Sequence, residues 1–522
     1  MKIQNPIIRG FYPDPSICEA EGKYYIACSS FQFFPGVPIF ESEDLVNWKQ
    51  VSNALTRLSQ VELHKVPSSG GVFAPTLRYH DGTFYMVTNN NTFGKNFYIS
   101  TRDIRGEWSE PVFVEQEGID PSLLFDEDGK VYFTSNGSDE NGRGCILQCE
   151  IDIATGEKLT ESIPVWAGSG GRYIESPHLY HIGEWYYLMV AEGGTEYGHM
   201  ITYARSRKPF GPFEAYQKNP VLTNRNLGGN QSRIQGIGHG DLIADKQGNY
   251  YIVCLGFRQS GEWQPYHHLG REVFLSPVKW QQDGWFTAGD NGIVTEWMET
   301  ELTGEQKTDI YHVSFETAGE KDLRWSYLRD YHKENYEFTK DGLFLRGTAL
   351  TLNDADTPTF VGVRQSEFDT RLSVKVSGEA KEAGVTFYMD ESQHYDLALV
   401  QGKGIGSRGC CGAAKESEPA STGEMVRQII LRLHVGDAEE IKSCVMLPES
   451  TDSVELMVES QPEKYDFYCM LQGERVFLGS ARTKYLSSEV AGGFTGVLMG
   501  LYAVDEEEKR AKFRDLVWRQ GK

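Results

Sequence analysis

The chain has 522 residues, 39% of them hydrophobic and 12% aromatic, and carries 51 basic against 74 acidic residues for a net charge of −23. A chain of this length folds as two or three domains with ample hydrophobic core. The acidic balance argues against nucleic acids and anionic membranes as partners, and favours a neutral or cationic ligand.

The first three hundred residues repeat one unit five times. The template is Gly118–Phe133, in which an acid and a Pro-Ser-Leu step lead through a turn into aromatic and β-branched residues. Such a unit is typical of a β-hairpin. The turn glycines lie 47 to 65 residues apart and are Gly22, Gly82, Gly129, Gly183 and Gly248. A four-stranded blade needs roughly 40–50 residues, so we predict a five-bladed β-propeller. The alternative is a β-sandwich whose hairpins are similar by chance.

The first strand of each propeller blade lines the central channel, so the residue that opens each unit should face the axis. The five openers are Asp14, Ala74, Asp120, Glu175 and His239. Burying several like charges together is costly, so three carboxylates and an imidazole converging on one cavity indicate a functional centre. For each acid taken alone, the alternative of a turn-starting residue stays open.

Three further residues could face a ligand in the channel. Phe31 lies in an aromatic loop, and Phe73 precedes the channel position of the second blade. Aromatic rings stack on the C–H face of sugars, although Phe31 could equally be core. The pair Gly193-Gly194 allows close backbone approach, so Thr195 could offer its hydroxyl to substrate. A plain loop is the alternative there.

The repeat ends near residue 300, and the polar stretch Glu299–Asp309 is typical of a linker. We therefore predict the propeller at 1–305 and a second domain at 306–522, whose alternating runs favour a β-sandwich. Gly402–Glu418 is expected to be a long surface loop. Phe494, flanked by glycines, could present one ring to a neighbouring surface; a turn with a packed ring is the alternative.

The N-terminal sequence has no apolar signal region, and no run of eighteen apolar residues occurs elsewhere. The nine cysteines are scattered without CxxC spacing, which favours reduced thiols and a cytoplasmic location. Cys145 and Cys149 are four residues apart, but no histidine lies near them, so a metal site there is the lesser alternative.

Inverting hydrolysis of a glycosidic bond needs one carboxylic acid to protonate the leaving oxygen and a carboxylate about 6.5–9.5 Å away to activate water. Opposite blades of a propeller can supply that separation. The sequence resembles glycoside hydrolase family 43, and in particular its two-domain β-xylosidases and α-L-arabinofuranosidases. The motifs that carry the resemblance are Phe11–Ser16, Gly118–Leu123, Ile174–Tyr180, Gly238–Gly240 and Leu269–Glu272.

The resemblance implies a role for each matching residue. Asp14 would be the general base and Glu175 the general acid, while Asp120 would tune the acid and orient the substrate. Arg271 would bind sugar hydroxyls, and His239 would lie near a central water or calcium ion. No other cofactor is implied.

The resemblance also implies an exo-acting enzyme that releases xylose from short xylo-oligosaccharides, with Phe494 closing one side of its pocket. Phe73 stands where many β-xylosidases of the family have tryptophan, so an α-L-arabinofuranosidase or a bifunctional enzyme is the alternative. A non-catalytic carbohydrate-binding propeller would not need three carboxylates, and a phosphorylase would need a basic cluster for phosphate. A homo-oligomer stays open.

Overall fold

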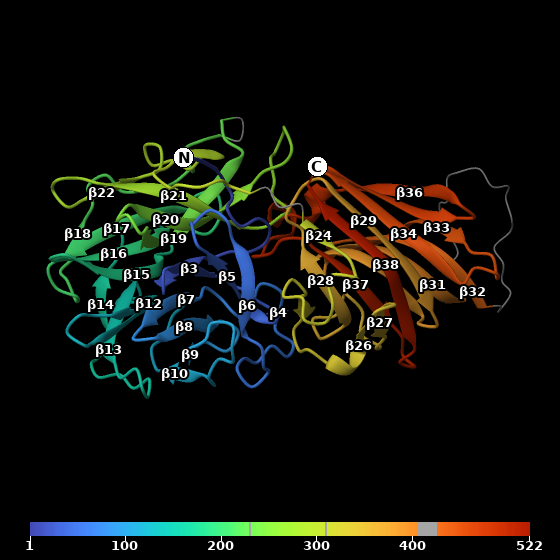
Figure 1. The fold of residues 1–522 in the computed structure, drawn as a ribbon, viewed down its shortest axis with the longest axis horizontal. Helices are drawn as coiled ribbons and strands as arrows, with labels where there is room; N and C mark the ends of the chain where they lie inside the picture. The colour runs from blue at the N-terminus through green and yellow to red at the C-terminus, as the bar shows by residue number, and fades with distance from the viewer. Residues whose placement is uncertain (229–230, 308–310, 404–424, 522) are drawn as a thin grey trace. The chain divides into compact units, whose positions relative to one another are not determined.

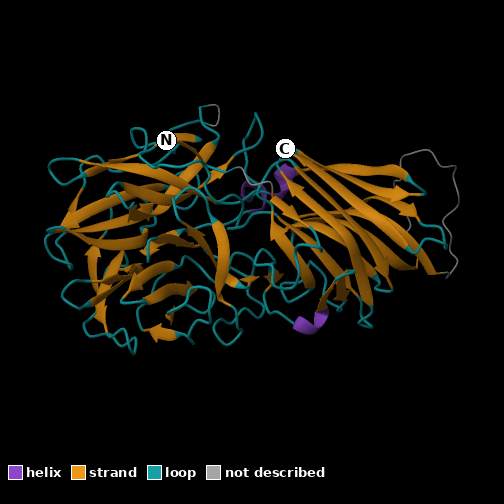
Figure 2. Cartoon of the chain, in the orientation of Figure 1, coloured by secondary structure: helices purple, strands orange, loops and turns teal. Residues whose placement is uncertain are grey.

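The computed structural model describes residues 1–228, 231–307, 311–403 and 425–521, whose regular secondary structure is almost entirely β-strand (Figures 1 and 2). The chain divides into two compact units. The first comprises 1–63, 69–262 and 271–307, and the second comprises 64–68, 263–270 and the chain from 308 onward. The boundary between 305 and 306 stays a prediction.

The first unit consists of five four-stranded antiparallel sheets, which confirms the five-bladed propeller. The short strand β4 (Phe33–Phe34) lies between β3 and β5 in sequence. The blades, each from its first strand to its last, are β2 (Ser16–Ala20), β3 (Lys23–Ala27), β5 (Gly36–Ser42) and β6 (Lys49–Leu55); β7 (Thr76–His80), β8 (Thr83–Asn90), β9 (Lys95–Thr101) and β10 (Val112–Val114); β11 (Ser122–Phe125), β12 (Val131–Ser138), β13 (Gly144–Ile151) and β14 (Ile163–Trp166); β15 (Glu175–Ile182), β16 (Trp185–Glu192), β17 (Met200–Ser206) and β18 (Glu214–Ala215); and β19 (Ile234–Ala244), β20 (Tyr250–Arg258), β21 (Glu272–Trp280) and β22 (Phe286–Ala288).

The repeated hairpin turns set the blade geometry. All five turn glycines have φ between 62° and 85°, a backbone region that glycine enters without a steric penalty. The first strands of neighbouring blades contact one another around the channel. The hydrophobic core lies in layers between adjacent blades; in one such layer Val87 and Tyr98 of the second blade pack with Leu123 and Phe133 of the third.

Strand pairing between the first and last segments of this unit closes the ring. β1 (Lys2–Gln4) pairs with β23 (Trp297–Glu299), and Ile8 forms an antiparallel bridge with Val273 in β21. Early and late residues of the first unit are therefore hydrogen-bonded together.

The second unit is a β-sandwich, as predicted, and its core cluster draws buried residues from both sheets, for example Val385 and Leu397 from one and Leu456 and Phe467 from the other. The remaining short elements are β25 (Tyr327–Leu328), η1 (Lys333–Asn335), η2 (Thr483–Leu486) and α1 (Ser488–Ala491). One sheet contains β24 (Tyr311–Val313), β26 (Tyr336–Thr339), β27 (Gly342–Arg346), β38 (Arg510–Gln520), β29 (Thr370–Gly378), β34 (Ser453–Gln461), β35 (Lys464–Leu471) and β36 (Glu474–Arg482), and the other contains β28 (Thr359–Arg364), β37 (Leu498–Val504), β30 (Glu382–Asp390), β31 (Gln393–Lys403), β32 (Met425–Val435) and β33 (Ala438–Met446).

The remaining sequence predictions concern Phe494, two cysteines, one loop and the absence of a membrane span. Phe494 follows α1 and the left-handed Gly492 and Gly493, and its side chain is partly exposed; its role at a pocket stays a prediction. Cys145 and Cys149 are buried free thiols in β13. The predicted loop within Gly402–Glu418 falls almost wholly outside the described residues, as do its two cysteines. Within the described parts of the chain, no helix has the length and apolar character needed to span a membrane.

Candidate active site

The structure brings the predicted acids and the histidine together in one cluster. His239 Nδ1 lies 3.6 Å from Asp14 Oδ1 and 4.0 Å from Asp120 Oδ2. The backbone N–H of Ser176 donates to Asp120 Oδ2 at 3.1 Å, which places Glu175, the preceding residue, next to Asp120. Asp14, Asp120 and His239 are buried, whereas Glu175 is half-buried. Four blades thus supply one cluster.

Three of these residues have a strained backbone. Asp14, Asp120 and His239 have φ of 56°, 53° and 44°, in the left-handed region that costs a residue with a side chain about 1–3 kcal/mol. Such strain persists where surrounding structure enforces it, and it is concentrated at functional sites. The close packing needs glycine at Gly238, because a Cβ there would lie 2.3 Å from the imidazole of His199.

Arg271 connects the carboxylate of Asp14 with two other predicted site residues. Its Nη1 lies 3.1 Å from Asp14 Oδ1 and donates to Thr195 Oγ1 at 2.8 Å. Its guanidinium carbon lies 5.6 Å from the ring centroid of Phe31. Phe31 and Phe73 meet edge to face at 5.3 Å. Thr195 and Phe31 therefore contact Arg271, and Phe73 contacts Phe31.

Phe31 also belongs to the core. Its ring is only 2% exposed and stacks on Phe11 with a centroid distance of 5.7 Å. The segment is fixed by an antiparallel bridge from Phe31 to Val72. A Cβ on Gly71 would lie 2.6 Å from the carbonyl oxygen of Phe31, so a glycine is required for this approach. Phe31 thus packs in the core and also contacts Arg271.

The surroundings of Asp14 favour its ionised form. Burial alone would raise its pKa, but Arg271, His239 and a hydrogen bond from the Ser29 hydroxyl outweigh burial, so the pKa lies below the usual 3.8. Asp14 is therefore a carboxylate at neutral pH. Sequence reasoning missed Ser29, because a serine in an aromatic loop carries no signal of its contact with an acid fifteen residues earlier.

The surroundings of Asp120 and Glu175 instead favour the protonated form of each carboxyl. Burial, followed by repulsion from Glu175 and Asp14, raises the pKa of Asp120 well above its usual value. Burial and repulsion from Asp14 raise the pKa of Glu175 to about 7, although Arg271 opposes the shift. Each of these adjacent carboxyls disfavours ionisation of the other, so this pair retains a proton near neutral pH. The site thus contains an ionised carboxylate and a protonated acid.

A calcium ion near His239, which the resemblance implies, would need oxygen ligands from the groups around it. Calcium prefers six to eight oxygen ligands. Among the described residues, no three clustered histidine, cysteine or acidic side chains are arranged to hold a metal ion. Burial also holds the pKa of His239 below its usual value, which makes the ring a neutral hydrogen-bonding group. These residues do not form a calcium site by themselves, and no step proposed below uses a metal.

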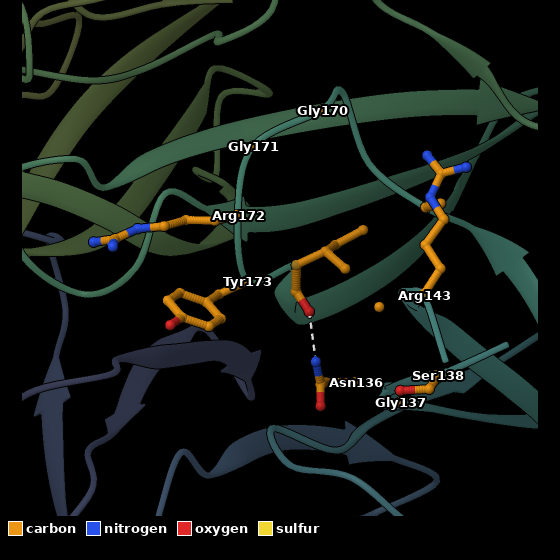
Figure 3. Close-up of a pocket in the computed structure, with 11 residues that line it drawn as sticks. Asn136, Gly137, Ser138, Arg143, Gly170, Gly171, Arg172 and Tyr173 are labelled. Carbon is orange, nitrogen blue, oxygen red and sulfur yellow. Dashed lines mark hydrogen bonds between the residues drawn. The ribbon is translucent and has the colours of Figure 1, made fainter. Parts of the chain in front are cut away.

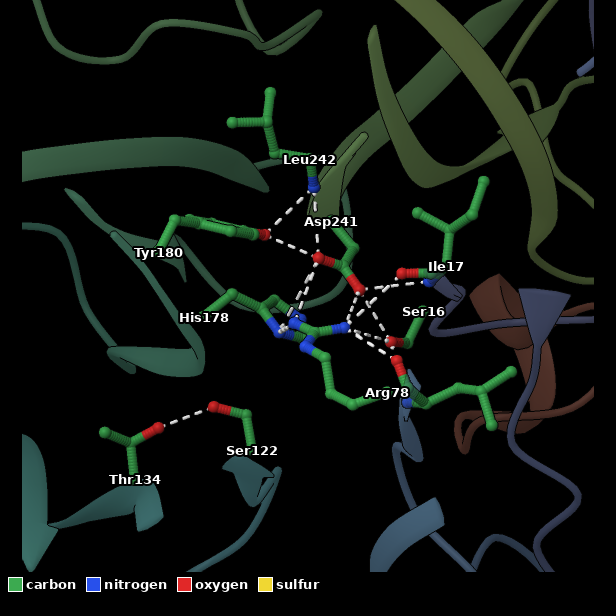
Figure 4. Close-up of polar contacts among 10 residues, drawn as sticks. Ser16, Ile17, Arg78, Ser122, Thr134, His178, Tyr180, Asp241 and Leu242 are labelled. Atoms are coloured by element: carbon green, nitrogen blue, oxygen red, sulfur yellow. Dashed lines mark hydrogen bonds and ion pairs between the residues drawn. The ribbon is translucent and has the colours of Figure 1, made fainter. Parts of the chain in front are cut away.

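A buried ionic network lies among the inner strands (Figure 4). Asp241 is fully buried and accepts hydrogen bonds from Ser16 Oγ at 2.6 Å, Arg78 Nη1 at 2.7 Å and Tyr180 Oη at 2.5 Å. Arg78 Nη2 donates to His178 Nδ1 at 2.9 Å, and burial lowers the pKa of that histidine to about 3. The network joins β2, β7, β15 and β19. Two of these strands, β15 and β19, carry Glu175 and His239, and β2 begins two residues after Asp14.

Asp241→Ala is expected to destabilise the propeller by about 3–5 kcal/mol, because it leaves the buried Arg78 guanidinium without its carboxylate partner. The measurement is the unfolding midpoint in urea, followed by intrinsic fluorescence. Glu115→Ala, which removes an exposed acid of the same unit, should change stability by no more than about 0.5 kcal/mol. Equal midpoints for the two variants would show that the network contributes little.

A five-bladed propeller whose channel holds an ionised carboxylate, a protonated acid and an arginine has the equipment for acid–base hydrolysis of a sugar acetal. The chain is a glycoside hydrolase. Residues 3–286 match the family model for glycosyl hydrolases family 43, and residues 313–518 match the model for the β-xylosidase C-terminal concanavalin A-like domain. The chain belongs to glycosyl hydrolase family 43.

Relatives of known name span the whole chain. A non-reducing end α-L-arabinofuranosidase of Bacteroides ovatus is 37% identical over 99% of this chain and 94% of its own length. A xylosidase/arabinosidase of Butyrivibrio fibrisolvens is 33% identical over 96% and 95%. Among solved structures, a xylan β-1,4-xylosidase from Bacillus halodurans has a TM-score of 0.88 at 29% identity and covers 99% of this chain and 100% of that chain.

Proposed function

We propose that this enzyme is an exo-acting, inverting glycosidase that removes single pentoses from the non-reducing ends of short oligosaccharides. The observation that carries the proposal is the cluster of Asp14, Asp120 and Glu175, in which the surroundings lower the pKa of Asp14 and raise the pKa values of Asp120 and Glu175. Asp14 would take a proton from the attacking water as that water bonds to the anomeric carbon. Glu175 would give its proton to the departing oxygen as the glycosidic bond breaks.

Asp120 and Arg271 would support this reaction without exchanging protons with the substrate. Asp120 is held by the Ser176 amide beside Glu175 and would tune that acid by sharing the pair's proton with it. Arg271 would hold sugar hydroxyls with the donors that do not face Asp14, while Thr195 fixes its guanidinium at 2.8 Å. A cytoplasmic location suits an exo-enzyme that acts on imported oligomers, and it stays a prediction.

The first candidate for the released sugar is xylose, from xylo-oligosaccharides. The second is α-L-arabinofuranose, which is favoured by the name of the full-length relative from Bacteroides ovatus and by Phe73 in place of tryptophan. Hydrolysis of p-nitrophenyl β-D-xylopyranoside and p-nitrophenyl α-L-arabinofuranoside under identical conditions decides between them. Comparable kcat/KM values on both would identify a bifunctional enzyme, and no hydrolysis of either would contradict the proposal.

Hydrolysis is expected to invert the anomeric centre, because water held by Asp14 attacks from the face opposite the bond that Glu175 protonates. Proton NMR during the first minutes of β-xyloside hydrolysis should show α-xylose before mutarotation produces the β form. If β-xylose appears first, the reaction retains configuration, and Asp14 would then be a nucleophile.

A further inference from the structure

Two histidines lie opposite each other on neighbouring strands of the second unit. His394 in β31 and His434 in β32 are cross-strand partners, and His394 Nε2 lies 3.2 Å from His434 Nδ1. Asn353, between β27 and β28, places its Oδ1 2.8 Å from His394 Nε2 and 3.0 Å from His434 Nδ1. Three polar atoms therefore form a triangle in which every side has the length of a hydrogen bond.

The three contacts cannot all be hydrogen bonds. Each atom of the triangle is either a donor or an acceptor, because a ring nitrogen carries a proton or a lone pair and an amide presents its oxygen or its NH₂ group. Two of any three such atoms are of the same kind, so at least one side of the triangle joins two donors or two acceptors. A cation would remove this conflict, since it accepts a lone pair from each atom.

The distances fit a transition metal. Zinc bonds histidine nitrogen at about 2.0–2.1 Å and oxygen at about 2.0–2.2 Å. The three measured separations place the atoms on a circle with a radius of about 1.7 Å, so an ion just above their plane can bond all three at zinc distances. Imidazole suits zinc, copper and nickel, whereas calcium and magnesium prefer oxygen ligands alone. The donor set therefore favours a divalent transition metal.

The ring of His394 is oriented from behind. It is 1% exposed, and its Nδ1 lies 2.9 Å from Oδ1 of the fully buried Asp396. A carboxylate only accepts hydrogen bonds, so Nδ1 carries the proton and Nε2 directs its lone pair into the triangle. Asp396 is itself 3.4 Å from Nη1 of Arg432. Buried carboxylates commonly fix metal-binding histidines in this way.

The triangle is open to solvent and needs little rearrangement to bind an ion. Asn353 is exposed and His434 is half-buried, which gives an ion a path to the three atoms. The segment that carries Asn353 is held by Thr351, whose backbone N–H and hydroxyl donate to Asp354 Oδ2 at 2.7 and 2.8 Å. Both strands and this segment are thus in place before binding.

A cavity alone does not supply such ligands, as a pocket of about 450 Å³ in the propeller shows (Figure 3). Its walls are fixed by Asn136, whose amide donates to the carbonyl oxygen of Ile174 at 2.7 Å, and by the buried carboxylate of Glu192, which accepts from the Gly171 N–H at 2.5 Å. Two of its eleven lining residues are arginines, and none is a histidine, cysteine or acid. A divalent cation would find no imidazole there.

We propose that His394, His434 and Asn353 form a binding site for a divalent transition metal of the zinc type, with Asp396 as the residue that positions His394. The ion would tie the segment between β27 and β28 to the sheet that contains β31 and β32. All four residues belong to the second unit, so the proposal is independent of the proposed function.

The test is calorimetric titration of Zn²⁺ into the full chain, without an affinity tag and after removal of metals with a chelator. Wild type should bind an equivalent of Zn²⁺ that His434→Ala weakens at least about 100-fold, because losing a ligand should exceed the roughly 10–100-fold effect of losing a group that orients one. Asn353→Ala should weaken it roughly tenfold, and Asn353→Asp should restore it through a carboxylate oxygen. Ca²⁺ and Mg²⁺ should not compete.

His312→Ala is the matched control, because His312 is an exposed histidine of β24 in the same unit. It should bind Zn²⁺ like wild type. His394 is left unchanged because it is buried, and matching circular dichroism shows that each variant is folded. A second readout is the visible absorption of bound Co²⁺, whose ligand-field bands should be lost in His434→Ala and kept in His312→Ala.

Three results would overturn the site. Wild type could bind no Zn²⁺, or His434→Ala could bind it unchanged, which would place the ion on other groups such as cysteine thiolates. The third is an equal loss of binding in His312→Ala and His434→Ala, because a nonspecific surface histidine effect would explain it.

Discussion

Asp14→Ala is expected to lower kcat by roughly 10²–10⁴-fold on every substrate, whatever its leaving group, because each turnover needs an activated water. The depressed pKa of Asp14 means that wild type keeps this base ionised at any pH above the usual 3.8. Initial rates on an aryl glycoside and on an oligosaccharide measure the loss, and the two ratios to wild type should agree.

The control for this variant is Asp126→Ala. Asp126 is also a buried aspartate of the propeller, but its carboxylate binds His181 Nδ1 and Tyr186 Oη, each at 2.6 Å, away from the carboxylate cluster. Its loss should reduce stability and leave kcat nearly unchanged at temperatures where the variant is folded. Labelling of Asp14 by a fluorinated substrate analogue would contradict its role as a base, since only a nucleophile is trapped covalently.

Glu175→Ala is expected to lower turnover according to the leaving group. Oligosaccharides and alkyl glycosides need protonation of the departing oxygen and should lose roughly 10²–10⁴-fold, whereas a p-nitrophenyl glycoside should lose much less. The measurement is the dependence of log kcat/KM on leaving-group pKa, which should be steeper for the variant than for wild type. Equal losses across the series would show that Glu175 is not the acid.

The pH dependence provides a second check on Glu175. Because the pKa of Glu175 is raised to about 7, its proton is present below that pH and is lost as the pH rises through it. Wild-type kcat/KM should therefore fall on the alkaline side of about pH 7. Glu175→Gln has no proton to lose, so its residual activity on an activated glycoside should show no such fall.

The repeat of hairpins was readable from the sequence because its causes are local. A glycine in a left-handed turn and two strands of β-branched and aromatic residues specify a hairpin wherever they occur. Five copies at blade spacing then leave few ways to bury every hydrophobic face, so the propeller followed from the pattern. The same alternation predicted the sandwich of the second unit.

The channel openers were also readable, because each stands at the same place in its unit and a ring brings equivalent positions together. Asp14, Asp120, Glu175 and His239 therefore appeared as a set before any contact was known. Their protonation could not be derived this way. It depends on burial and on Arg271, which lies 257 residues from Asp14 in the chain and 3.1 Å away in space.

Residues that do not open a repeat unit could be given a role only from the tertiary structure. Ser29, Asn136, Glu192 and Asp241 are polar side chains that sequence reasoning gave no role, because serine, asparagine and acids occur throughout loops and strand ends. What distinguishes them is their hydrogen-bond partners on other segments or blades and, for Ser29, Glu192 and Asp241, complete burial. Local composition and spacing determine the hairpins and their arrangement in a ring. Hydrogen-bond partners, desolvation and pocket walls depend instead on distances between segments, which only the folded chain defines.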